Sequence, residues 1–252
     1  MWAYARLPIL APMSRKAESS VDESTAPLPK VVTFENVVLG TAEHPGAAPL
    51  SFTVEQGGLC LLAGPARAGK SEALARIALE CGGGGRVLLF GRDTSRLKAR
   101  EVPLLRRRIG RIFQDLRLDD DLNAFDNVAL AVRAIGRPAQ DSRHQIAEVL
   151  AWLGLAAQMG KRPKRLSNLD RRRLAVARAV INRPTLIIAD EPTGELTGKA
   201  AAALLRPLID MHHVGTTVLI ASRRADLLVD AGATVIALAP SPAPDVAAGA
   251  AA

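Results

Sequence analysis

One eight-residue stretch has the residue types and spacing of a phosphate-binding loop. It reads Gly64-Pro65-Ala66-Arg67-Ala68-Gly69-Lys70-Ser71 and fits the P-loop pattern G-x-x-x-x-G-K-[ST]. Backbone amides of such a loop point at phosphate oxygens, the lysine ammonium reaches the β- and γ-phosphates, and the hydroxyl binds Mg²⁺. We therefore predict that this stretch, together with the next residue, Glu72, binds a nucleoside triphosphate, with Ser71 as a magnesium ligand.

A second stretch supplies two carboxylates. The apolar run Ile187-Ile188-Ala189 ends in Asp190 and Glu191. If the run is a strand, both acids lie at the carboxyl edge of a sheet, beside the P-loop. We expect Asp190 to hold Mg²⁺, directly or through water, and Glu191 to orient or deprotonate the attacking water. The alternative interpretation is that the two acids are only a solvated strand end.

The segments around the P-loop are those that the motif requires. Residues 59–63 are an apolar run typical of a buried strand, and residues 71–79 are rich in helix-forming residues. This strand–loop–helix context favours a phosphate site over the alternative, a glycine turn that matches the pattern by chance.

Strand and helix patterns alternate along the chain, which predicts an α/β fold with a mostly parallel sheet. Residues 31–34 and 50–54 predict antiparallel strands that precede this core. Residues 115–165 show helical patterns without a strand, which indicates an inserted all-α subdomain. We also predict a basic helix over residues 97–108 and a short helix over residues 223–230.

The two ends of the chain differ in composition from the middle. Residues 1–30 are rich in Ser, Pro, Ala and charge, and residues 239–252 are rich in Pro and Ala. We predict a disordered leader and a disordered tail on either side of one nucleotide-binding domain, residues 31–238.

The net charge of +8 indicates an anionic partner, and much of the excess lies in three clusters: residues 106–108 with Arg111, 161–165 and 171–173. The clusters are interpreted as solvated faces or as contacts with anionic lipid headgroups. We do not expect nucleic acid as a partner, because aromatic residues make up only 3% and do not interleave with the basic ones. Two cysteines exclude a disulfide framework, and no run reaches the roughly 20 apolar residues of a membrane span.

Together these motifs resemble the ATP-binding cassette (ABC) ATPases, and within that family the cell-division branch of FtsE proteins. The resemblance spans about residues 31–238 and is most specific over residues 95–115 and 189–194, with residues 125–129 in addition. It implies a P-loop NTPase core of the ABC fold, ATP and Mg²⁺ as cofactors, and ATP hydrolysis. The resemblance also assigns roles to six side chains: catalytic Lys70, Gln114 and Glu191, magnesium ligands Ser71, Gln114 and Asp190, and Ser167 at the nucleotide.

The same resemblance implies partners. Family members act as dimers that hold two nucleotides between a P-loop and the signature segment of the other subunit. Residues 115–165 would dock on an FtsX-like integral membrane subunit. We therefore expect a cytoplasmic protein that is peripheral on the inner face of the cell membrane and acts in cell division.

The chain departs from the family pattern at several positions. The signature Leu-Ser-Gly-Gly-Gln/Glu reads Leu166-Ser167-Asn168-Leu169-Asp170, so both glycines that permit close backbone approach are absent. The other departures are Arg223 for the switch histidine, Thr197 for the D-loop aspartate, Thr41 for the adenine-stacking aromatic and Glu72 for threonine.

These departures are unevenly distributed among the functional groups. The groups that act within one subunit are intact, whereas those that act across a dimer, and the switch, are altered. We therefore expect ATP and Mg²⁺ to bind and hydrolysis to be slow or dependent on a partner. The alternative is a nucleotide-gated scaffold that binds ATP with little or no hydrolysis. A P-loop motor directed at nucleic acid ranks last.

Overall fold

The computed structural model describes residues 28–40, 48–138, 140–224, 228 and 230–239. Most of the predicted leader and tail, the position of Thr41 and most of the predicted helix 223–230 lie outside the described residues. None of the helices in the described part has the length and apolar character needed to cross a bilayer.

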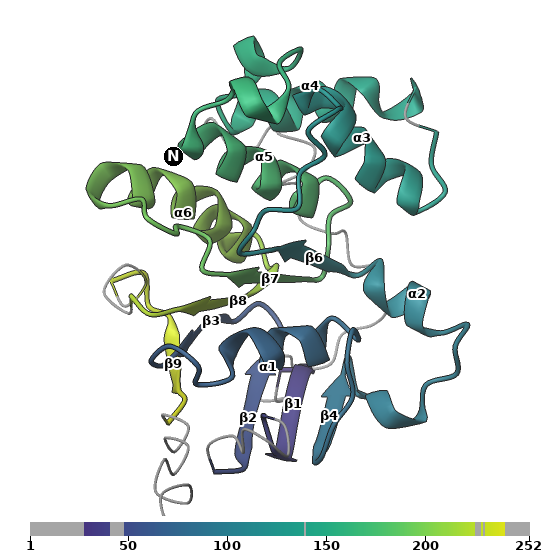
Figure 1. The fold of residues 1–252 in the computed structure, drawn as a ribbon. Coiled ribbons are helices and arrows are strands. Elements are labelled where there is room, and N and C mark those ends of the chain that lie inside the picture. Colours follow the sequence, from purple (N-terminus) through teal and green to yellow (C-terminus); the bar gives the residue numbers. More distant parts are fainter. Residues whose placement is uncertain (1–27, 41–47, 139, 225–227, 229, 240–252) are drawn as a thin grey trace, which may run out of the picture.

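A parallel sheet of five strands forms the centre of the molecule, in the order β6-β7-β8-β3-β9 (Figure 1). Its strands are β6 (Ile109–Ile112), β7 (Leu186–Asp190), β8 (Thr217–Ser222), β3 (Leu59–Ala63) and β9 (Thr234–Ala237). A second, antiparallel sheet has the order β2-β1-β4-β5. Its strands are β2 (Leu50–Glu55), β1 (Lys30–Val37), β4 (Arg86–Leu89) and β5 (Arg92–Asp93). The predicted fold class, an α/β core with additional antiparallel strands, is confirmed.

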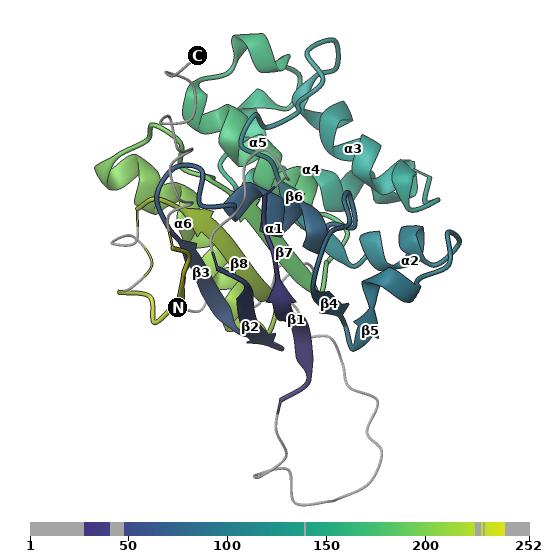
Figure 2. The same cartoon turned by 60° about the horizontal axis from the view of Figure 1, so that its bottom comes forward.

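Helix α1 (Lys70–Ile77) lies between the two sheets, as Figures 1 and 2 show. It packs on β4 of the antiparallel sheet and on β7 and β8 of the parallel sheet. Strand β7 alternates between two cores: Leu186 and Ile188 pack in the α1 layer, whereas Ile187 and Ala189 pack with the helices on the opposite face. Because both faces are covered, these strands read as continuous apolar runs.

The opposite face of the parallel sheet is covered by α5 (Asn168–Val180) and α6 (Gly198–His213), and α3 (Ala124–Ala134) and α4 (Arg143–Trp152) pack on α5 (Figure 1). Within residues 115–165 the described chain contains α3, α4 and short 3-10 turns, and no strand. Helix α3 begins after Asn123, whose side chain accepts a hydrogen bond from the Asp126 amide at 2.8 Å.

The predicted helix over residues 97–108 is wrong in extent. Helix α2 covers only Val102–Arg106, and a 3-10 turn, Thr94–Arg96, precedes it. Pro103 lies in the first turn of α2, the position that proline favours because its missing N–H has no helical partner there. The Glu101 carboxylate accepts a hydrogen bond from the Lys98 amide at 2.7 Å, which holds the preceding residues as a turn.

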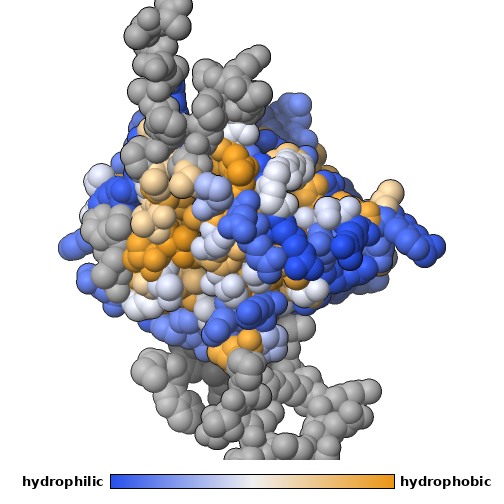
Figure 3. Space-filling view, turned by 90° about the horizontal axis from the view of Figure 1, so that it is seen from below, coloured by the Kyte–Doolittle hydropathy of each residue, from blue (hydrophilic) through white to orange (hydrophobic). Residues whose placement is uncertain are grey.

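The lower face of the molecule combines apolar and hydrophilic areas (Figure 3). Among the described residues, large apolar side chains are exposed at Leu28, Val38, Leu104, Leu130 and Val235. They come from different elements of the chain. Single exposed apolar side chains are normal on folded domains, and we assign them no function.

Strand β6 and helix α5 approach each other so closely that only glycine fits at residue 110. A Cβ on Gly110 would lie 2.4 Å from the Ala179 carbonyl oxygen. We therefore predict that Gly110→Ala lowers the free energy of unfolding by about 1–3 kcal/mol, measured by urea denaturation. Gly160→Ala is the control, because nothing lies within 4 Å of its Cβ position. Equal unfolding midpoints for the two variants would contradict this packing.

Candidate functional site

The P-loop joins the end of β3 to the start of α1. Gly69 adopts a left-handed φ of 86°, and a Cβ there would lie 2.9 Å from Leu39 Cδ1. A Cβ on Gly64 would lie 2.9 Å from the Leu238 carbonyl oxygen. Glycine is therefore required at Gly69 by the backbone conformation and the close contact, and at Gly64 by the close contact.

Lys70 lies against the first two residues of the loop. Its Nζ donates hydrogen bonds to the carbonyl oxygens of Gly64 at 2.6 Å and Pro65 at 2.8 Å, and the residue is 7% exposed. Burial lowers the pKa of this ammonium below its usual value, the nearby carboxylates of Glu191 and Asp190 act to raise it, and Arg223 acts to lower it. The same four charges thus meet at the P-loop.

Asp190 ends β7 and is 7% exposed. The Ser71 side chain hydrogen-bonds this carboxyl group, whereas the buried Oδ1 atom has no hydrogen-bond partner among the described residues. Burial is the main cause that raises the pKa of Asp190. A buried, unpartnered carboxylate oxygen beside a hydroxyl fits Mg²⁺, which binds one or two carboxylates together with substrate phosphates.

Gln114 lies two residues beyond β6, at the same edge of the sheet. Strand β6 pairs with β7 in parallel, with Ile112 opposite Ala189, so the chain after β6 continues beside Asp190 and Glu191. No group of three His, Cys, Asp or Glu residues in the described part could hold a metal ion. The predicted magnesium ligands Asp190, Ser71 and Gln114 instead offer a carboxylate, a hydroxyl and an amide.

Glu191 is held by the end of the neighbouring strand, β8. Its Oε1 accepts a hydrogen bond from the Arg223 backbone amide at 3.0 Å, and its Oε2 accepts one from the Ser222 hydroxyl at 3.2 Å. The Arg223 Nε atom lies 3.3 Å from Oε1 as an ion pair. Sequence reasoning noted Arg223 but missed Ser222. The pairing of Asp190 with Ala221, which follows from β7 and β8 being neighbours, places Ser222 beside Glu191.

Glu72 follows the P-loop, but its carboxylate is turned to other partners. Its Oε2 accepts a hydrogen bond from the Gly40 amide at 2.6 Å, and its Oε1 pairs with Arg76 at 2.9 Å. Both oxygens of the Glu72 carboxylate are therefore engaged by other parts of the protein.

Ser167 caps α5. Its hydroxyl accepts a hydrogen bond from the Asp170 amide at 3.1 Å and donates one to the Asp170 carboxylate at 2.8 Å. Both bonds are local and the residue is exposed. The structure does not join Ser167 to the P-loop of its own chain.

Two arginines of α5 contact the segments that follow Glu191 and Gln114. Arg172 donates a hydrogen bond to the Pro192 carbonyl at 2.8 Å. Arg178 donates to the carbonyl oxygens of Leu116 and Arg117, which have left-handed φ values of 61° and 45°. Sequence reasoning placed Arg172 in a basic surface cluster, but this guanidinium is used inside the protein.

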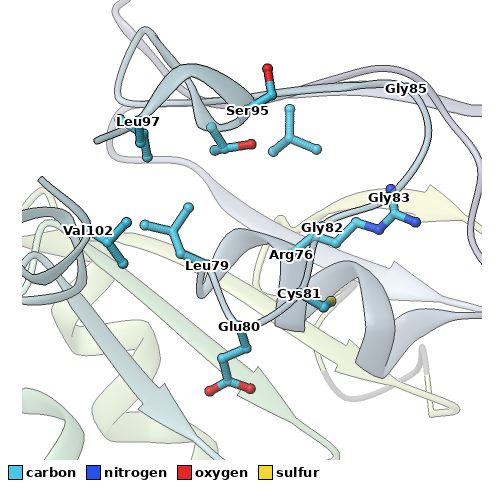
Figure 4. A pocket seen from close by; sticks show the side chains of 12 residues that line it. Arg76, Leu79, Glu80, Cys81, Gly82, Gly83, Gly85, Ser95, Leu97 and Val102 are labelled. Atoms are coloured by element: carbon cyan, nitrogen blue, oxygen red, sulfur yellow. The ribbon is translucent and has the colours of Figure 1, made fainter. Parts of the chain in front are cut away.

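A pocket of about 290 Å³ lies at the far end of α1 (Figure 4). Residues of the last turn of α1, the glycine-rich segment after it and the loop before α2 form its walls. Figure 4 shows Leu79, Leu97 and Val102 facing one another across the hollow. Since Lys70 begins α1 and this pocket surrounds its end, the pocket is separate from the candidate phosphate site.

Comparison with known proteins matches residues 47–194 to the family model described as ABC transporter. The chain is 38% identical over 180 residues to the cell division ATP-binding protein FtsE of Escherichia coli (strain K12), covering 71% of this chain and 81% of the relative. It is similar to the dimeric structure of MJ0796, a bacterial ABC transporter cassette, with a TM-score of 0.75, 26% identity, and coverage of 83% and 94%. A dimeric post-hydrolysis state of MJ0796 bound to ADP and Pi matches with a TM-score of 0.74 and 26% identity, and coverage is 82% and 94%.

The raised pKa of Asp190 has a consequence for stability. Because the folded pKa lies above the unfolded value, the ionised carboxylate costs stability at neutral pH, and this cost disappears as the pH falls below the unfolded value. We predict that Asp190→Asn raises the melting temperature without ligands by about 2–4 °C, the shift for 1 kcal/mol in a chain of this size. The same variant should lose the additional stabilisation by ATP with Mg²⁺.

Thermal melts with and without ATP and Mg²⁺ check both effects. Asp120→Asn is the control, since Asp120 is half exposed and its ion pair in the described part of the chain is with Lys164 at 3.5 Å. A lower melting temperature for Asp190→Asn than for the wild type would contradict the assignment.

Proposed function

Because this chain belongs to the ABC transporter family and is one of its ATPases, we propose that it is the ATP-binding subunit of an FtsEX-like complex. In this proposal it hydrolyses ATP in a dimer of ATP-binding subunits, at the inner face of the cell membrane, with an FtsX-like integral membrane subunit. The name of the FtsE relative supports the role in cell division, and the dimeric cassette structures support a dimer.

The proposed reaction is attack of water on the γ-phosphorus, with breakage of its bond to the β–γ bridging oxygen. Loop amides and Lys70 bind the phosphates, and Glu191 orients the water and accepts its proton. Ser71, Gln114 and Asp190 would hold Mg²⁺, which neutralises charge on the β- and γ-phosphates. The observation that carries this proposal is the buried, unpartnered Asp190 Oδ1 beside Ser71 and the P-loop.

Two contacts favour the alternative, an ATP-gated scaffold with little turnover. The Ser167 hydroxyl is bonded to the Asp170 carboxylate, which would repel the phosphate of another subunit. Glu191 is paired with Arg223, so the predicted base is already engaged. Both contacts involve positions where the sequence departs from the family pattern.

A second pocket, of about 330 Å³, is a candidate docking site for the membrane subunit. It lies between α2, β6, α3 and α5, where the core meets the helical segment. Apolar residues such as Ile109, Ala131 and Ile135 line it together with Arg106, Arg107 and Arg178. These residues suit an amphipathic segment with acidic side chains, which we propose the membrane subunit supplies.

Nucleotide binding and turnover test the proposed chemistry. We expect the wild type to bind ATP with Mg²⁺ and to hydrolyse it slowly. Lys70→Ala should weaken ATP binding about ten- to a hundredfold, because a charge-assisted phosphate contact is lost. Glu191→Gln should keep binding and lower turnover by about 10²-fold or more.

Calorimetry and phosphate release measure these two quantities separately. ATP binding with equal turnover for the wild type and Glu191→Gln would favour the scaffold. The absence of binding to any nucleotide would contradict both functions.

Co-purification tests the docking site. With an FtsX-like membrane protein co-expressed in the same cells, Arg107→Glu should reduce the recovered complex severalfold, because the exposed charge at the pocket is reversed. Arg206→Glu on α6 is the control, since α6 lies on the other side of the molecule in Figures 1 and 2. An undiminished complex with Arg107→Glu would argue against this pocket.

A further inference from the structure

The Glu191 carboxylate is the most heavily engaged group of the candidate site. It is 12% exposed and accepts hydrogen bonds from the Ser222 hydroxyl and the Arg223 amide, and the Arg223 guanidinium pairs with it as well. A carboxylate offers about four acceptor positions. The two hydrogen bonds orient the Glu191 carboxylate. The guanidinium lies beside Oε1, where a water molecule would otherwise donate a hydrogen bond, and it neutralises the charge of that oxygen.

Arg223 also changes the charge of the site. Lys70 and Arg223 are positive, and Asp190 and Glu191 are negative, so these four side chains sum to zero. A neutral histidine at residue 223 would leave one net negative charge. The Arg223 side chain is 63% exposed, so it is not enclosed by packing, and its charge acts on Lys70, the residue that binds the phosphates.

A terminal phosphate competes for this guanidinium. It carries close to two negative charges, against one on a carboxylate, and its oxygens accept the two parallel hydrogen bonds that guanidinium donates. A diphosphate has no γ-phosphate, and its own terminal phosphate is the β-phosphate, which the P-loop and Lys70 bind. Breaking the Glu191–Arg223 ion pair costs free energy. A contact between Arg223 and the γ-phosphate of ATP can offset this cost, whereas ADP has no γ-phosphate to do so.

We propose that Arg223 is a triphosphate-dependent gate on Glu191. Without a γ-phosphate its guanidinium pairs with the carboxylate, and a γ-phosphate draws the guanidinium away and frees Oε1 for water. The gate rests on the proposed function, since it requires ATP at the P-loop. It gives the site a preference for ATP over ADP and keeps the base engaged until substrate is present.

A double-mutant cycle on nucleotide affinity tests the gate. Dissociation constants for a non-hydrolysable ATP analogue and for ADP, each with Mg²⁺, are measured for the wild type, Arg223→Gln, Glu191→Gln and the double variant. Arg223→Gln should weaken the analogue about tenfold and leave ADP within about twofold. Glu191→Gln should strengthen the analogue severalfold, because the guanidinium no longer leaves a carboxylate, and this gain should vanish in the double variant.

Arg206→Gln is the matched control. Arg206 is 65% exposed, and its Nε pairs with the Asp210 carboxylate, itself 11% exposed, at 2.9 Å on α6. It should change neither affinity. Equal effects of Arg223→Gln on the analogue and ADP, or a Glu191→Gln gain that persists in the double variant, would overturn the gate while leaving the ATPase proposal intact. A wild type that binds neither nucleotide would overturn the proposed function and the gate together.

Discussion

Parallel pairing of β6, β7, β8 and β3 is the constraint on which the site depends. Parallel strands bring their carboxyl ends to one edge, and the register sets which residues meet there. Ala63 pairs with Ser222, and Asp190 pairs with Ala221. The P-loop, the two acids and the segment that begins at Arg223 therefore all start at the same edge of the sheet. Apolar layers on both faces hold this register, because a slip by one residue would exchange the two cores.

Charged side chains lie close together, and partly buried, at that edge of the sheet. Asp190 is buried with an unpartnered oxygen, and Lys70 is bonded to loop carbonyls. Glu191 has a left-handed φ of 41°, an unusual conformation for a glutamate. Arg172 of α5 bonds to the next residue, Pro192, and so fixes the segment that carries this conformation. The fold therefore stabilises an arrangement that local preferences disfavour.

Two of the positions that depart from the family pattern, Asp170 and Arg223, have the same effect in the structure. Asp170 takes up the hydroxyl of Ser167, and Arg223 takes up the carboxylate of Glu191. Each substitution adds a charged partner to a group that the family resemblance assigns to the nucleotide. Neither contact replaces the hydrogen bonds that Lys70 donates to the loop carbonyls. Both contacts bear on turnover, which is the distinction between the ATPase and the scaffold.

Features that depend on local backbone preference could be predicted from the sequence alone. These include the glycines of the P-loop, the apolar strand that ends at Asp190, and Ser167 as the cap of α5. The short length of α2 was also within reach, because Pro103 marks its first turn. In these cases neighbouring residues in the chain settle the conformation.

Only the tertiary structure decided where charged side chains point. Glu72 turns to Gly40, and Ser222 reaches Glu191, across 32 and 31 residues of sequence. Such contacts depend on which strands are neighbours and on a register that no local pattern encodes. The sequence does not distinguish a solvated arginine from one that, like Arg172, is hydrogen-bonded within the protein. The partner of Arg172 is a backbone carbonyl, and every residue has one.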